Sequence, residues 1–143
     1  MSGIVVGIDG SGNSQRALDW AVKEAGVRHA PLTVLAVHQV AANQWTGNPL
    51  IYPEDTPQQE KARQAAEEAV SKAVSEAGDA KPSSVTVRAV SGLAARELID
   101  ASRDADLVVV ASRGAGGFAS LLLGSVSSQV VQHAASPVVV VKN

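Results

Sequence analysis

The stretch VVVASRGAGGFASLLLGSVSS, residues 108–128, decides how the rest of the chain is interpreted. It starts as an apolar run typical of a buried strand and breaks at Ser112. The break is followed by three glycines within four positions, Gly114, Gly116 and Gly117. The stretch then reaches a Gly–Ser pair at 124–125, just before a segment with helical spacing. We interpret it as a strand, a glycine loop and a helix N-terminus, whose main-chain N–H groups suit a phosphate.

Length and composition indicate one α/β domain. The chain has 143 residues, the size of an ordinary domain, so we expect residues 1–143 to fold as one unit. Hydrophobic residues make up 45% of the chain but aromatic residues only 3%, so the core must be built from Val, Ala, Leu and Ile. Such a core is typical of strands that helices bury on both faces.

Charge and cysteine content exclude several functional classes. The formal net charge of −2 leaves no basic footprint for nucleic acid, and no Lys/Arg cluster marks a membrane surface. The absence of cysteine excludes disulfides, thiolate catalysis and Cys-ligated metals. The N-terminus has no basic n-region, and no apolar run approaches the roughly 20 residues of a membrane helix. We therefore expect a cytoplasmic protein.

Apolar runs alternate with helical patterns along the chain. Strands are predicted at Ile4–Ile8, Leu32–Val37, Val85–Val90, Leu107–Ala111 and Pro137–Val141. Helices are predicted up to about Arg28, and then at Gln58–Ala77, Ala94–Arg103 and Val126–Ala134. This alternation of strand and helix predicts an open five-stranded parallel sheet with helices on both faces.

Two of the predicted strands end in loops with unusual chemistry. Asp9, Gly10 and Ser11 follow the first strand, and the glycine loop follows the fourth. In open parallel sheets, ligands bind beyond the carboxyl ends of the strands, where the strand order reverses. If the first and fourth strands are neighbours, a carboxylate faces N–H donors across one crevice. That division suits a nucleotide, with hydroxyls toward the acid and phosphates toward the glycines.

The chain resembles the universal stress protein family, specifically its ATP-binding branch. That branch carries the pattern Gly-x2-Gly-x9-Gly-Ser/Thr. Here Gly114 is followed by nine residues and then by Gly124–Ser125, which matches, whereas Ala111 stands at the first glycine position. The segments Ile4–Ser11 and Pro137–Val141 are also similar to the family, so the resemblance covers essentially the whole chain.

The resemblance implies a Rossmann-like fold of the adenine nucleotide alpha hydrolase type, with strand order 3-2-1-4-5. It implies ATP as the ligand, with which Mg²⁺ is compatible, and a homodimer that pairs through the strand at Pro137–Val141. Asp9 would contact the ribose or the adenosine side, and the backbone of Val37 would meet the adenine edge. The full set of residues predicted to bind ATP is Asp9, Gly10, Ser11, Val37, Ala111, Arg113, Gly114, Gly116, Gly117, Gly124, Ser125, Val126 and Ser127.

Two positions in this set leave alternatives open. Glycine is needed at position 111 if the backbone has a positive φ or if the ligand presses on it, and the methyl group of Ala111 would then weaken binding. If Ala111 is only the last strand residue, the methyl group is harmless. Arg113 either pairs with a phosphate, whose geometry suits a guanidinium, or faces solvent.

The predicted function is an ATP-binding regulator or sensor in a stress response. Donors for phosphates are present, but no general base, metal-ligand cluster or Walker lysine accompanies them, although slow hydrolysis stays open. Two alternatives remain. Ala111 motivates a dimeric interaction module that has lost nucleotide binding, and Asp9–Ser14 is loosely similar to the pyrophosphate loop of adenylating enzymes.

Overall fold

A computed structural model describes residues 3–9, 12–39, 57–112 and 125–142 of the chain. The strands are β1 (Ile4–Ile8), β2 (Pro31–Gln39), β3 (Ser84–Gly92), β4 (Leu107–Ala111) and β5 (Val138–Val141). The helices are α1 (Gly12–Arg28), α2 (Pro57–Ala77), α3 (Ala94–Ser102) and α4 (Ser125–His133). Strand and helix alternate along the described chain, as the sequence predicts.

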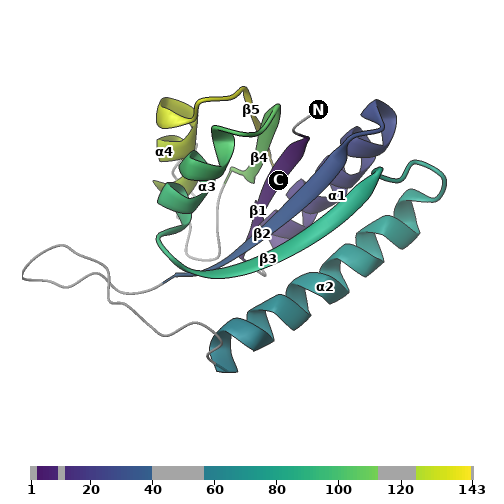
Figure 1. Ribbon diagram of the computed structural model, residues 1–143, viewed down its shortest axis with the longest axis horizontal. Helices are drawn as coiled ribbons and strands as arrows, with labels where there is room; N and C mark the ends of the chain where they lie inside the picture. Colours follow the sequence, from purple (N-terminus) through teal and green to yellow (C-terminus); the bar gives the residue numbers. More distant parts are fainter. Residues whose placement is uncertain (1–2, 10–11, 40–56, 113–124, 143) are drawn as a thin grey trace, which may run out of the picture.

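The five strands form one parallel sheet in the order β3-β2-β1-β4-β5 (Figure 1). The expected strand order is thus confirmed. The order reverses at β1, whose two neighbours are β2 and β4. In folds of this kind the reversal opens a crevice at the carboxyl ends of the two central strands. The two sheet edges are β3, most of which alternates between exposed and partly buried residues, and β5.

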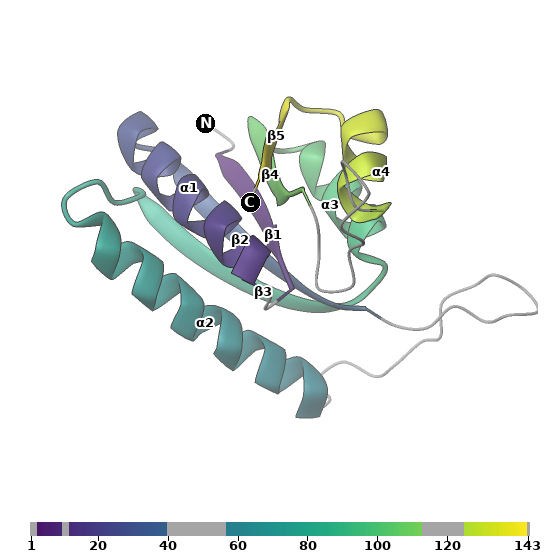
Figure 2. The ribbon, with the colours of Figure 1, turned by 180° about the vertical axis from the view of Figure 1, so that it is seen from behind.

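Two helices cover each face of the sheet (Figure 2). On one face, buried side chains of α1 such as Leu18 and Val22 pack with Val70 of α2 on β1, β2 and β4. On the other face, Leu98 of α3 and Val130 of α4 pack on the alternate side chains of the same strands. The core is almost entirely Val, Leu, Ile and Ala, as the composition requires.

Several strand and helix boundaries differ from the predicted ones. β2 begins at Pro31 and extends to Gln39, beyond the apolar run, because every one of its residues pairs with a residue of β3. β5 begins one residue after Pro137. In α4, the apolar residue Val131 is 46% exposed, because its neighbour Val130 takes the place in the core. Helical spacing cannot decide between such neighbours.

One glycine sets how closely a helix approaches the sheet. A Cβ added at Gly7 in β1 would lie 2.8 Å from Cδ1 of Leu98. That distance is shorter than a normal carbon–carbon contact, so a larger residue at position 7 would force the side chain of Leu98 to move. The glycine therefore makes room for Leu98 of α3 on the central strand.

Candidate functional site

The sheet register brings three chain segments together at its carboxyl edge. Ile8 pairs with Ala36, so Asp9 and Val37, the next residues on β1 and β2, come to the same level. On the other side Val6 pairs with Val109, so Asp9 and Ser112 lie equally far along β1 and β4. Asp9, which is exposed, thus lies between the ends of β2 and β4. The predicted crevice required β1 and β4 to be neighbours, and they are.

The helices that follow the two central strands start at this edge, one on each face of the sheet. α1 starts at Gly12 and runs back to the amino edge, where β2 begins, and α4 starts at Ser125. Neither helix has an acidic residue in its first turn, whereas α2 has Glu60 and α3 has Glu97 there. The first N–H groups of a helix have no intrahelical partner, and its N-terminus carries a partial positive charge. The two helix starts that flank the reversal of strand order therefore favour an anion.

A buried hydroxyl joins the end of β4 to the start of α4. Ser127, which is 2% exposed, donates its hydroxyl hydrogen to the carbonyl oxygen of Ser112, at 2.9 Å. Ser112 is itself 4% exposed, and its N–H donates to the carbonyl of Val141 in β5, also at 2.9 Å. This chain of hydrogen bonds fixes the first turn of α4 against the two strands beside it.

The backbone at Ala111 is that of an ordinary strand residue. Ala111 ends β4 and pairs with Val141, and among the described non-glycine residues only His29, which follows α1, has a positive φ. The methyl group of Ala111 packs with Ile8 and Val141 against the core on the face that carries α1 and α2. The conformation at position 111 therefore does not require glycine, which answers the first of the two questions about this position.

The other described members of the predicted set lie at the same edge. Val37 ends the apolar part of β2 and packs toward the face that carries α3 and α4. Ser125 and Val126 form the start of α4, and Val126 is partly buried against that same face. The remaining members, Gly10, Ser11, Arg113, Gly114, Gly116, Gly117 and Gly124, lie outside the described residues. The ligand contacts of the whole set stay predictions.

Sequence reasoning missed the role of Ser112. It marked only the point where the apolar run breaks, yet its carbonyl and N–H hold α4 and β5 respectively. A main-chain group has no sequence signature of its own. The only available signal was a small polar residue directly after a fully apolar strand, which is compatible with many other roles.

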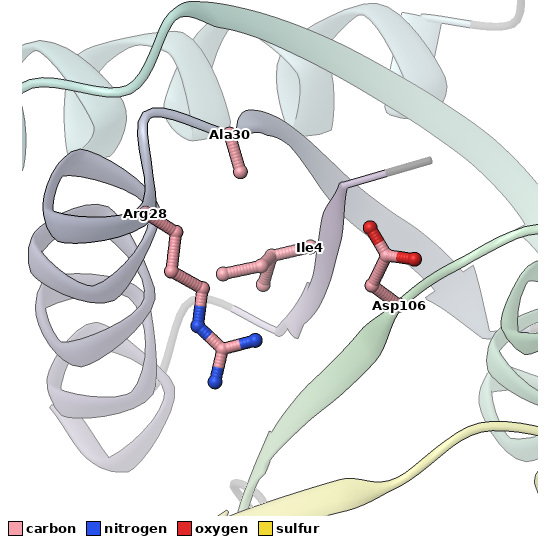
Figure 3. A pocket seen from close by; sticks show the side chains of 4 residues that line it. All are labelled: Ile4, Arg28, Ala30 and Asp106. Atoms are coloured by element: carbon pink, nitrogen blue, oxygen red, sulfur yellow. The ribbon is translucent and has the colours of Figure 1, made fainter. Parts of the chain in front are cut away.

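A hollow lies at the opposite edge of the sheet. It is an open hollow of about 530 Å³ lined by Ile4, Arg28, Ala30 and Asp106, which all lie near the amino ends of strands (Figure 3). Its two charged groups have partners within the protein. Asp106 accepts a hydrogen bond from the N–H of Gly3 at 2.9 Å, and Arg28 pairs with Glu24 at 2.8 Å. This hollow therefore lies at the other end of the strands from the predicted crevice, and both of its charged groups are held by contacts within the protein.

The described residues hold no group of three or more His, Cys, Asp or Glu side chains that could bind a metal ion. His29 follows α1 and His133 ends α4, and both are exposed. In the parts of the chain that the structure describes, none of the helices combines the length and apolar character needed to cross a bilayer.

Comparison with known proteins gives a consistent result. The sequence profile of the universal stress protein family matches residues 1–142. A universal stress protein of Mycolicibacterium smegmatis is 37% identical over 139 residues, which is 97% of this chain and 47% of the relative. The chain thus spans about half the length of the curated relatives that it matches.

Solved structures share the fold. The universal stress protein UspA of Lactobacillus plantarum superposes with a TM-score of 0.75 at 23% identity, covering 96% of this chain and 95% of that one. A universal stress protein crystallised in complex with cAMP gives a TM-score of 0.67 at 26% identity, with 97% and 94% of the two chains covered.

Proposed function

The chain belongs to the universal stress protein family, and from this premise we propose that it binds an adenine nucleotide, ATP, at the carboxyl edge of its sheet. One observation carries the proposal. The register of β1 with β2 and β4 places Asp9 level with Val37 and Ser112. Directly beside them, the hydroxyl of Ser127 fixes the start of α4. A carboxylate and a helix N-terminus thus share the edge where strand order reverses.

The proposed roles follow from this arrangement. Asp9 accepts hydrogen bonds from the ribose hydroxyls, and the adenine lies against the end of β2 at Val37. The phosphates lie toward the first turn of α4, where the absence of an acidic residue leaves the helix N-terminus attractive to an anion. The complex of a 26%-identical family member with cAMP supports an adenine nucleotide as the ligand class. The sequence also has glycines at 114, 116, 117 and 124, whose main-chain N–H groups are additional donors for phosphate oxygens. These additional donors favour a triphosphate as the ligand.

We propose a regulator or sensor that responds to bound nucleotide, because the sequence supplies phosphate donors without a Walker lysine or a general base beside them. Nucleotide released from the purified and denatured protein, identified by mass spectrometry, gives the most direct test. ATP or its adenine products are expected. Titration calorimetry should then show binding of ATP with at least tenfold preference over GTP, because the adenine edge meets the backbone of β2.

A matched pair of variants locates the site. Asp9→Asn should weaken ATP binding about tenfold, the equivalent of one hydrogen bond to a charged group. Asp106→Asn makes the same chemical change at the opposite edge of the sheet, and it should leave the affinity within about twofold. If purified protein carries no nucleotide and neither ATP nor cAMP produces heat, the proposal is wrong. If both variants lose equal affinity, the ligand does not bind at the carboxyl edge.

A homodimer through Pro137–Val141 is a second proposal, and the position of β5 favours it. β5 is a sheet edge, and its four valines are all partly exposed. The carbonyls of Pro137 and Val141 accept hydrogen bonds from Val108 of β4 and from Ser112, so the main-chain groups of Val138 and Val140 face away from β4. An apolar strand with outward main-chain groups favours pairing with a second strand. Light scattering at micromolar concentration should give twice the monomer mass of 14.6 kDa, and a monomer would contradict the proposal.

A further inference from the structure

Ser127 has a hydroxyl whose direction is set inside the protein. It lies in the first turn of α4, is 2% exposed, and donates to a carbonyl that is fifteen residues earlier in the chain. A serine hydroxyl has a single hydrogen to donate. Since that hydrogen points at Ser112, it is not available to a phosphate oxygen, although Ser127 belongs to the set predicted to bind ATP.

The partner of this hydroxyl is well fixed. Ser112 follows β4 directly, is 4% exposed, and donates its N–H to Val141 of β5. Ser112 is therefore fixed to the sheet, and the hydrogen bond from Ser127 fixes α4 relative to the sheet. Hydrophobic contacts of Val130 hold the same helix to the sheet, but they restrict sliding along the helix axis less than a directional hydrogen bond does.

We propose that Ser127 is a positioning residue for phosphate recognition: its hydroxyl sets the distance of the α4 N-terminus from the ends of β4 and β1. This inference rests on the proposed nucleotide function. Serine at 127 does not contact the ligand through its side chain. It decides instead where the first N–H groups of α4 lie relative to Asp9, and hence whether one nucleotide can reach both.

A second buried serine provides the comparison. Ser102 is 1% exposed, donates to the carbonyl of Ile99, and accepts the N–H of Ala135 at 2.8 Å. It therefore holds the chain just after the C-terminal end of α4, whereas Ser127 holds its N-terminal end. The two residues are matched in type, in burial and in their hydrogen bonds to main-chain groups, but only Ser127 lies at the carboxyl edge.

The experiment measures the affinities of ATP and of adenosine for each variant by calorimetry, together with the melting temperature. Adenosine lacks phosphates, so the ratio of the two affinities reports phosphate recognition alone. Ser127→Ala should weaken ATP binding about tenfold, the loss of one well-placed hydrogen bond, while adenosine stays within about twofold. Ser127→Thr keeps the hydroxyl and should restore the ratio. Ser127→Cys keeps the size of the side chain with a weak donor and should behave as alanine does.

Ser102→Ala is the control for a purely structural effect. It should lower the melting temperature about as much as Ser127→Ala does, since each change removes the hydrogen bonds of a buried serine hydroxyl to main-chain groups, but the ratio of affinities should not change. Equal losses for ATP and adenosine in the Ser127 variants, or an equal loss of the ratio in Ser102→Ala, would overturn the inference alone. So would failure of both Ser127→Ala and Ser127→Cys to fold, since Ser127 would then serve folding. Wild-type protein that binds no ATP overturns the proposed function, and the inference with it.

Discussion

Replacing Ala111 with glycine restores the residue that the ATP-binding pattern has at this position, and we expect it to impair the protein slightly. Ala111 is the last residue of β4, its φ is not positive, and its methyl group packs with Ile8 and Val141 on the α1 face of the sheet. α4, where we place the phosphates, packs on the other face. The methyl group therefore points away from the proposed phosphate site.

The expected loss of stability follows from two terms. A fully buried methyl or methylene group contributes about 0.8 kcal/mol, and this partly buried one about half of that. The added backbone freedom of glycine in a strand contributes about 0.5–1 kcal/mol more. The free energy of unfolding should thus fall by about 1–1.5 kcal/mol, which lowers the melting temperature by about 3–5 °C in a domain of this size.

Thermal unfolding and ATP titration of Ala111→Gly measure the two consequences separately. We expect the lower melting temperature together with an ATP affinity within about twofold of the wild type. Ala89→Gly, at a partly buried alanine in β3, is the control, because it removes the same methyl group from a different strand. If Ala111→Gly instead tightens ATP binding tenfold or more, the ligand presses on position 111. The reasoning from the direction of the methyl group would then be wrong.

Three further changes test the packing and the electrostatics. In α1, Gly26→Ala should lower the free energy of unfolding by about 1–3 kcal/mol, because the new Cβ would lie 2.5 Å from the carbonyl of Ala80. Helix propensity alone predicts the opposite, a gain of about 1 kcal/mol. A chemical denaturation curve decides the sign. Val130→Ala empties a fully buried position between α4 and the sheet and should lower the free energy of unfolding by about 2 kcal/mol, and an unchanged denaturation midpoint would contradict the assigned core. The hydrogen bond from Arg63 lowers the pKa of Glu60, so any stability that this pair adds is present above the ordinary glutamate pKa and is lost as pH falls through the lowered pKa. Arg63→Ala should therefore raise the pKa of Glu60 in an NMR titration. The same change should leave the stability at pH 7 measurably unaltered, because the pair is exposed.

The sequence by itself determined the elements and the fold class. Apolar runs and helical spacing act over a few residues, so they identify β1 or α3 without knowledge of the rest of the chain. The same local patterns mark which side of α1 faces the sheet, since the apolar residues Leu18 and Val22 lie four positions apart and are both completely buried there. The resemblance to a family added the strand order, which periodicity left open.

Only the tertiary structure decided how the edge is assembled. The pairing of β1 with β2 and β4 puts Asp9 level with Val37 and Ser112, which are far apart in sequence, and no local pattern encodes that register. The direction of the Ser127 hydroxyl is likewise settled by a carbonyl fifteen residues away. Local preferences fix what each segment becomes. Which groups meet depends on long-range burial and hydrogen bonding, because those contacts form only when the whole sheet is in place.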